Sequence, residues 1–389
     1  MRRWLAALWF GIVVFLAFPG HAEAGQWKGQ GEETEEYLEE LMKEEDFSEL
    51  DAWVDLLPAG DGKLSFSDLV SELAEQGFEE FDYSLILKWG ADSLFSELAG
   101  NKTLLVEVVL LVMGFSVLRN FSGAFRSAYI SELCFMLVYC VMAVMLLQSF
   151  LAFRDIVTEA LNSSVGFMQA LVPVLCIAMV FSSGAGASAG FYQMAFLVIY
   201  LIEWLFLKLL MPCIHVYVIL ELFNHFFEDE KFQNLTELIN GLVCWGLKIS
   251  GAVVLGLNVV QSLIAPARDR FVNGTVSKAA AAIPGIGNSI DGVSELLLGS
   301  GLLIKNSVGA AALIFLVISG LIPIAKVLCM AVMYKLAAVV TEPVADKRIA
   351  GCLKGMAEGG MLYVKLMIYC MVLFFLTVAL TTAASSFIY

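Results

Sequence analysis

Beyond residue 100, the chain alternates long apolar stretches with short polar connections. A helix needs about 20 apolar residues to cross a hydrocarbon layer about 30 Å thick. The stretches that meet or approach this length lie at residues 103–118, 129–151, 165–183, 242–264, 302–322, 323–341 and 361–386. Each is predicted to be a transmembrane helix.

One further apolar region, residues 190–226, is long for a single span and contains Pro212. Because proline interrupts a helix, this region fits either one kinked span with an interfacial helix or two short spans. Cytoplasmic loops are enriched in Lys and Arg, so the distribution of these residues among the loops can decide between the two possibilities. With one crossing, the outside loops hold only Arg154 and Lys231. The inside loops then hold Arg119, Arg126, Arg268, Arg270, Lys278, Lys305, Lys347, Arg348 and Lys354. Two crossings would move most of these outside, so one crossing is favoured.

The pattern therefore predicts an all-α, polytopic integral membrane protein with about eight transmembrane helices and both ends of the mature chain outside. Composition agrees, since 59% hydrophobic residues, 16% charged residues and a mean hydropathy of +0.81 are typical of multi-spanning membrane proteins. The basic loops at 265–280 and 346–354 are expected in the cytoplasm. The residues expected to meet partner proteins or anionic lipid there are Arg268, Arg270, Lys278, Lys347 and Arg348.

The first 24 residues have the pattern of a cleavable signal peptide. Arg2 and Arg3 precede an apolar core, and Ala22 and Ala24 form a small-x-small cleavage site. An uncleaved anchor helix is the alternative. In both cases the following segment is expected to be exported.

The exported segment, residues 25–100, is strongly acidic and precedes the membrane domain at 101–389. It has 4 Lys or Arg against 21 Asp or Glu, a net charge of −17. This sign opposes nucleic-acid binding. Apolar residues recur at helical spacing on both sides of Pro58, which predicts two or three short amphipathic helices in an extracytoplasmic segment.

Charged residues inside the apolar stretches are candidates for a polar pathway, because a lone charge in lipid is costly. Glu107 and Lys335 lie deepest, and Glu203 and Lys208 are close enough in sequence to pair. A structural ion pair is as good an explanation for them as conduction.

Glycine-rich and acidic motifs have ordinary structural explanations as well. "SSGAGASAG" at 182–190 fits a tight turn or a helix contact, with a flexible gate as the alternative. The segment 279–307 is broken by Pro284 and several glycines, so it predicts a surface-lying or re-entrant element. "DGKLSFSD" at 61–68 has only half of a calcium loop, and a turn that begins a helix is favoured.

No arrangement of catalytic or metal-binding residues emerges from the sequence. His215 and His225 are ten residues apart without a Cys or His cluster around them, and no phosphate-binding or nucleophile motif occurs. We therefore expect no enzymatic activity, no cofactor and no metal.

Two stretches of the C-terminal half carry a resemblance to a known family. They are "AAAAIPGIGNSIDGVSELLLGSGLLIKNSVGAAAL" at 279–313 and "LIPIAKVLCMAVMYKLAAVVTEPV" at 321–344. Together with the signal peptide, acidic exported segment and polytopic region, they resemble the stage III sporulation protein AE family of endospore-forming bacteria.

This resemblance implies a component of the mother-cell membrane around the forespore. It would belong to the transenvelope complex that links the two cells. The implied partners are the other products of the stage III sporulation operon (AA to AH), including its ATPase, and stage II sporulation protein Q. The family supplies no catalytic residues.

The leading hypothesis is a non-enzymatic channel or secretion-complex subunit required for endospore formation. The alternatives are a stand-alone transporter of small solutes and a purely structural membrane scaffold.

Overall fold

The computed structural model describes residues 48–55, 65–76, 128–183, 185–226, 231–280, 287–343 and 347–384, together with Val106, Leu110, Met113 and Gly114. The helices among them are α3 (Ser48–Asp55), α4 (Phe66–Gln76), α6 (Ala128–Ser183), α7 (Ala185–Ile202), η1 (Glu203–Leu210), α8 (Met211–Phe226), α9 (Gln233–Ala280), α10 (Gly287–Thr341) and α11 (Lys347–Ala384). The predicted signal peptide with Ala22 and Ala24, Glu107 and most of the predicted span 103–118 lie outside the described residues.

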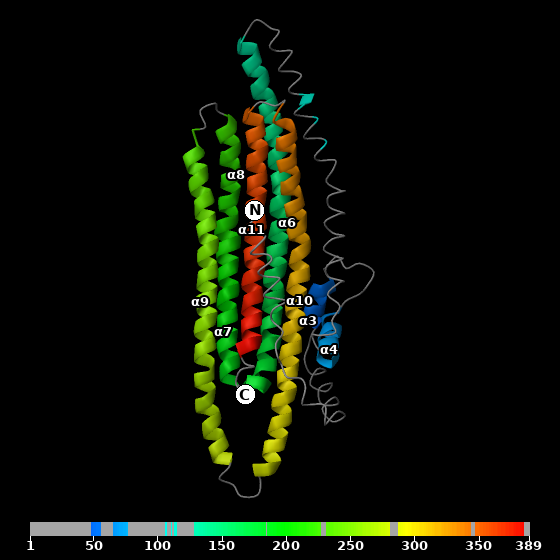
Figure 1. Cartoon of the computed structure of the whole chain (residues 1–389), viewed down its shortest axis with the longest axis vertical. Coiled ribbons are helices and arrows are strands. Elements are labelled where there is room, and N and C mark those ends of the chain that lie inside the picture. Colours follow the sequence, from blue (N-terminus) through cyan, green and yellow to red (C-terminus); the bar gives the residue numbers. More distant parts are fainter. Residues whose placement is uncertain are drawn as a thin grey trace.

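The long helices form a bundle of five antiparallel rods (Figure 1). α6, α9, α10 and α11 are one rod each, and α7, η1 and α8 join end to end into the fifth. α8 ends and α9 begins at the upper end of the bundle in Figure 1, where α10 also ends and α11 begins. The turn from α6 to α7, the α9–α10 connection and the end of α11 lie at the lower end.

All five rods are long and apolar enough to cross a membrane. The candidate spans are Tyr139–Val180, Ser188–Phe226, Gln233–Leu257, Leu302–Thr341 and Lys347–Leu380. The prediction of an all-α protein with multiple membrane-spanning helices is thereby confirmed. The region 190–226 forms one continuous rod made of α7, η1 and α8, without the interfacial helix that the single-span prediction included.

The count of eight spans differs from the structure in two places. Residues 129–151 and 165–183 were predicted as separate spans but both belong to α6, and 302–322 and 323–341 both belong to α10. The sequence between the first two, residues 152–164, contains polar residues but neither glycine nor proline, so nothing in it ends a helix. In α10, Pro323 lies within the helix without ending it.

The segment 279–307 was predicted to be a surface-lying or re-entrant element. From Gly287 onward it is the first part of α10. Glycines disfavour a helix by about 1 kcal/mol each, but packing against neighbouring helices can outweigh this. Just beyond this segment, α10 packs closely on α11: a Cβ at Gly309 would lie 2.2 Å from Cγ2 of Thr382.

A π-helix, η1, replaces the kink predicted at Pro212. The backbone N–H of Met211 donates to the carbonyl O of Phe206, five residues earlier. Pro212 has no N–H and its ring collides with the preceding turn of an α-helix. A wider turn just before the proline is a usual way to accommodate both problems.

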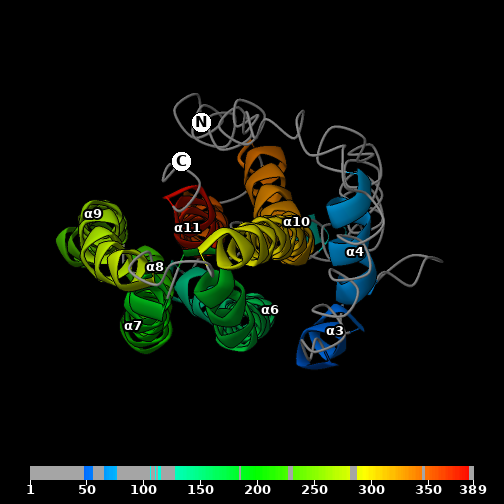
Figure 2. The ribbon, with the colours of Figure 1, turned by 90° about the horizontal axis from the view of Figure 1, so that it is seen from below.

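The core is richest where α6, α8, α10 and α11 meet. Phe150 of α6 stacks on Tyr363 of α11 with ring centroids 5.3 Å apart, and the ring of His215 on α8 meets Phe150 edge-on at 5.7 Å. α9 is peripheral. Of its most apolar 18-residue stretch, 22% is buried inside the bundle, against 61% for α10. Figure 2 shows α9 at one edge of the bundle and α3 and α4 at the opposite edge.

Two helices of the acidic segment pack against the bundle. Leu50 of α3 and Phe66 of α4 are fully buried, and the Phe66 ring meets Phe167 of α6 edge-on at 6.2 Å. Oδ1 of Asp51 accepts hydrogen bonds from the backbone N–H groups of Phe66 (2.7 Å) and Ser67 (3.1 Å). This carboxylate caps the start of α4 from another helix. A helix therefore begins at Phe66, within the motif at 61–68, while residues 61–64 lie outside the described residues.

Candidate functional site

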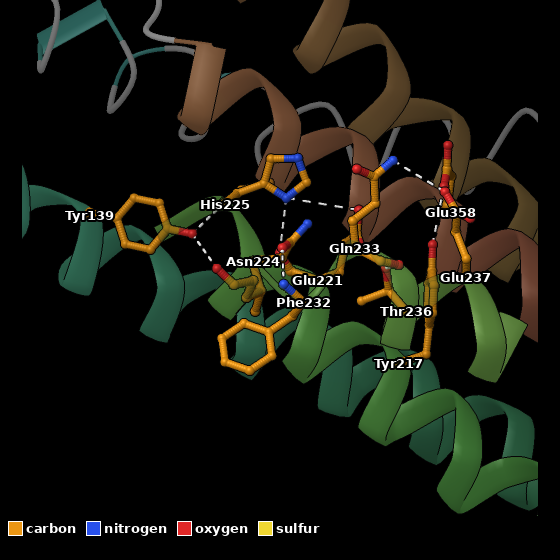
Figure 3. A network of polar contacts seen from close by, with 12 residues as sticks. Tyr139, Tyr217, Glu221, Asn224, His225, Phe232, Gln233, Thr236, Glu237 and Glu358 are labelled. Carbon is orange, nitrogen blue, oxygen red and sulfur yellow. Dashed lines mark hydrogen bonds and ion pairs between the residues drawn. The ribbon is translucent and has the colours of Figure 1, made fainter. Parts of the chain in front are cut away.

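A polar pocket of about 300 Å³ lies between α8, α9 and α11 towards the upper end of the bundle (Figure 3). Its lining is almost entirely polar. The lining residues are Tyr217, Glu221, His225, Gln233, Thr236, Glu237, Asn240, Gly351, Lys354, Gly355 and Glu358. Because the three helices are otherwise strongly apolar, this gathering of polar side chains is the clearest candidate site among the described residues.

α8 contributes Tyr217, Glu221 and His225, which are four residues apart and so share one helix face. Nδ1–H of His225 donates to the backbone carbonyl of Glu221 at 2.9 Å and lies 3.8 Å from its carboxylate Oε1. Both side chains are largely buried, at 15% and 16% exposure. This pairing orients the imidazole and the carboxylate against α11.

α11 makes room for this face with a stripe of glycines at four-residue spacing. A Cβ at Gly351 would lie 2.0 Å from Cδ2 of His225. A Cβ at Gly355 would lie 2.3 Å from Cγ of Glu221. Such distances are far inside van der Waals contact, so the approach of α8 to α11 requires glycine here.

The remaining carboxylates of the pocket are held by neutral donors. The Tyr217 hydroxyl donates to Oε2 of Glu358 at 3.1 Å, which ties α8 to α11. On α9, Nε2 of Gln233 donates to Oε1 of Glu237 at 3.2 Å. With Glu221, the pocket therefore has three carboxylates, and Lys354 is the only Lys or Arg in its lining. Glu237, Lys354 and Glu358 are exposed, whereas Glu221 and His225 are largely buried.

The pocket is braced from both sides by further hydrogen bonds. Oδ1 of buried Asn224 accepts from the backbone N–H of Phe232 at 2.8 Å, which fixes the approach of the chain to α9. The Tyr139 hydroxyl of α6 donates to the carbonyl of Leu222 on α8, and it lies 2.7 Å from Sγ of Cys352 on α11. These contacts join three helices next to the pocket.

Comparison with known proteins now identifies the family. The family described as stage III sporulation protein AE matches residues 64–385, which include the whole helical bundle and α4. The chain belongs to the stage III sporulation protein AE family. It is also 28% identical over 362 residues to the stage III sporulation protein AE of Bacillus subtilis (strain 168), covering 89% of each chain. No solved structure is detectably similar to it.

This result confirms the resemblance carried by residues 279–313 and 321–344. The chain is thus a membrane protein of a sporulation family. The pocket-lining residues lie within the region matched by the family.

Three of the four charged residues expected to mark a polar pathway lie in the described part of the chain. Glu203 and Lys208 both lie in η1, half-buried and exposed respectively, and they form no ion pair with each other in the described part of the chain. Lys335 lies on an exposed face of α10. Glu107 is outside the described residues.

The two basic segments expected on one side of the membrane lie at opposite ends of the bundle. Arg268, Arg270 and Lys278 belong to the last part of α9, which runs to the lower end. Lys347 and Arg348 begin α11 at the upper end. The difference follows from α10 being one rod instead of two spans.

The pocket itself was not predicted from the sequence. One signal was present: "GCLKGMAEGG" at 351–360 has glycines four apart at 351, 355 and 359, which is the small-residue spacing of close helix pairs. The spacing of Tyr217, Glu221 and His225 is equally visible. The sequence does not show that these two faces meet each other and α9, because this depends on how the helices pack.

Proposed function

We propose that this chain is a non-enzymatic membrane subunit of the channel or secretion complex that links mother cell and forespore during endospore formation. The family match over residues 64–385 carries this proposal, because it covers the complete bundle and one helix of the exported segment. The five long apolar rods fit a subunit that resides in the mother-cell membrane around the forespore.

The partners we propose are the other products of the stage III sporulation operon (AA to AH), including its ATPase, and stage II sporulation protein Q. The acidic segment 25–100 would meet them between the two membranes, where its net charge of −17 favours basic surfaces. Its described helices, α3 and α4, pack on α6 and α10 respectively, which supports a position of this segment beside the bundle.

The bundle suggests one change to the predicted topology. With residues 25–100 exported and one span at 103–118, α6 begins on the cytoplasmic side, so the upper end with Lys347 and Arg348 faces the cytoplasm. Each rod then crosses once. The lower end, with Arg268, Arg270 and the C-terminus, faces outward.

Affinity purification of the tagged full chain from sporulating cells tests the proposal. We expect the operon's other products to co-purify, including the ATPase, and we expect the chain alone in liposomes to transport no small solute. Solute transport by the purified chain, without co-purifying operon products, would instead support the stand-alone transporter.

A further inference from the structure

The five rods carry charged residues at one common level of the bundle. These residues, one from each rod, are Glu159 of α6, Lys208 of η1, Lys248 of α9, Lys326 of α10 and Lys365 of α11. Glu159, Lys208 and Lys248 are exposed, and Lys326 and Lys365 are half-buried. We call these five residues the charged belt.

Contacts between the central rods place three members of the belt at the same level. A Cβ at Gly360 of α11 would lie 2.9 Å from Cβ of Ala331 on α10 and 3.1 Å from the Phe153 ring of α6. Lys365 and Lys326 both lie five residues below this contact, because α11 runs downward in Figure 1 and α10 runs upward. The belt residue of α6 lies six residues below it, since α6 also runs downward.

The two outer rods join the belt at this level. The Thr158 hydroxyl of α6 donates to Sδ of Met211 at 3.6 Å, and Met211 lies three residues above Lys208. The adjacent Leu210 meets α9, where a Cβ at Gly246 would lie 2.8 Å from its Cδ2, two residues above the belt residue of α9. Because a helix rises 1.5 Å per residue, the five belt residues lie within about one helical turn of each other.

Below the belt, every rod has a stretch without a charged residue. These stretches are 160–183, 185–202, 249–267, 306–325 and 366–384, and the second begins just below the half-buried Glu203. Each contains 18 to 24 residues, which span about 27–36 Å as a helix. This length matches one hydrocarbon layer, which is about 30 Å thick.

Above the belt, charged residues return too soon for such a layer. Glu221, Glu237, Lys335 and Glu358 each follow within 13 residues of the belt in α8, α9, α10 and α11, and the last three are exposed. A comparable charge-free stretch occurs above the belt in α6 alone, at residues 133–153. Exposed apolar side chains occur on both sections and do not discriminate, because they are common on water-facing surfaces. A charge in hydrocarbon is expensive, so the charges decide.

We propose that lipid hydrocarbon contacts the bundle only below the charged belt, and that Lys208 and Lys248 bind the phosphates of anionic lipid head groups at its edge. Long basic side chains near the end of a span extend to this interface. The section above the belt, which holds the polar pocket, then projects from the membrane, so that its exposed Glu237 and Glu358 lie in water. This lipid level depends neither on membership of the proposed complex nor on which end faces the cytoplasm.

The lipid contact lies on the side of α7 and α9. The exposed apolar side chains of these two helices below the belt include Tyr192, Phe196, Leu197, Val253 and Leu255. At the opposite edge of the bundle, α3 and α4 cover α6 and α10 in place of lipid (Figure 2). Their exposed Glu49 and Asp68 exclude hydrocarbon from the outer faces of these two helices.

Hydroxyl-radical footprinting of the purified full chain in lipid nanodiscs tests the lipid level. Radicals formed in water oxidise side chains that water reaches, and oxidation rates are normalised to those of the unfolded chain. Tyr192 and Phe196 below the belt have matched partners above it in Tyr129 and Phe223, and all four are exposed in the bundle. We expect oxidation to be lost at Tyr192 and Phe196 and retained at Tyr129 and Phe223.

Co-purified lipid tests the head-group contact. The full chain is incorporated into vesicles of phosphatidylcholine and phosphatidylglycerol in equal amounts, extracted in mild detergent, and its retained lipid is quantified by mass spectrometry. We expect retained phosphatidylglycerol to exceed phosphatidylcholine. The double variant Lys208→Gln, Lys248→Gln should lose about half of this excess or more, because it removes two of the four belt lysines. The matched control Lys335→Gln, Lys347→Gln changes two exposed lysines above the belt and should leave the excess unchanged.

The lipid level is overturned if Tyr192 and Phe196 are oxidised as fast as Tyr129 and Phe223, if all four are protected, or if the pattern is reversed. The head-group contact is overturned if phosphatidylglycerol is not in excess, or if the control pair lowers the excess as much as the belt pair. Failure of the operon's products to co-purify would contradict the proposed complex and leave both results standing.

Discussion

Gly359 lies at a close contact between α11 and α8. A Cβ at this position would lie 2.2 Å from Cγ2 of Val218 and 3.4 Å from the Phe150 ring. Val218 is β-branched and fully buried, so its side chain has little freedom to move aside. Glycine is therefore required here by packing, although it weakens the isolated helix.

Replacing this glycine should destabilise the bundle. Gly359→Ala is expected to lower the free energy of unfolding by about 1–3 kcal/mol, the usual effect of overpacking a core. Gly241→Ala is the matched control, because nothing lies within 4 Å of its added Cβ. That control should be neutral or stabilising by up to about 1 kcal/mol, since alanine favours a helix. Unfolding midpoints of the purified variants in detergent measure both, and equal midpoints would contradict the packing described.

Part of the pocket can be predicted from the spacing of individual residues in the sequence. The four-residue spacing of the α11 glycines and of Tyr217, Glu221 and His225 can be read directly. Glu237 gives no such signal, because its place in the pocket depends on how α9 packs beside α8. Similarly, Lys305 was predicted in a cytoplasmic loop, but it is fully buried in α10.

α6 is the element in which sequence pattern and structure differ most. Arg154 and Asp155 interrupt its apolar run, which favours a loop between two spans. In the structure these residues pair with each other at 2.9 Å on the helix surface, at 42% and 66% exposure. Hydropathy averages over all faces of a helix, so it cannot distinguish a charged surface patch from a turn. The absence of glycine and proline from 152–164 was the better indicator.

A proline substitution tests the continuity of α6. Glu159→Pro should destabilise the protein by about 3 kcal/mol or more, because proline removes an internal hydrogen bond and its ring collides with the preceding turn. Glu159→Ala is the control, and it should have little effect because the side chain is exposed. If residues 152–164 formed a loop, both variants would unfold at the same temperature as the original chain.

The rod made of α7, η1 and α8 was better predicted. Charge bias predicted one crossing for this region, and Pro212 marked the irregular turn. The last residue of η1, Leu210, also packs closely on α9: a Cβ at Gly246 would lie 2.8 Å from its Cδ2. The π-turn and this glycine fit each other across two helices, which no local pattern shows.

At the scale of the whole molecule, the rods are longer than one membrane crossing requires. The 42 residues of Tyr139–Val180 span about 63 Å as a helix, about twice the hydrocarbon thickness. Even at a tilt of about 40°, such a rod projects beyond the hydrocarbon layer. Exposed charges partway along the rods, such as Asp155 of α6 and Lys208 of η1, fit a bundle that is only partly enclosed by lipid.

The antiparallel order of the rods decides which connections share a side. Residues between α8 and α9 lie at the same end as those between α10 and α11, and the α9–α10 connection lies at the other end. The eight-span prediction requires a different grouping, since it places the loops at 265–280 and 346–354 together. The five-rod and eight-span topologies therefore place some of the connections on opposite sides of the membrane.

Reporter fusions after residues 229, 283, 345 and 389 test this arrangement most directly. With the exported acidic segment and five rods that each cross once, alkaline phosphatase should be active after 283 and 389. A fluorescent protein that folds only in the cytoplasm should fluoresce after 229 and 345. Phosphatase activity after 229 together with fluorescence after 283 would contradict the five-rod topology and restore the eight-span layout.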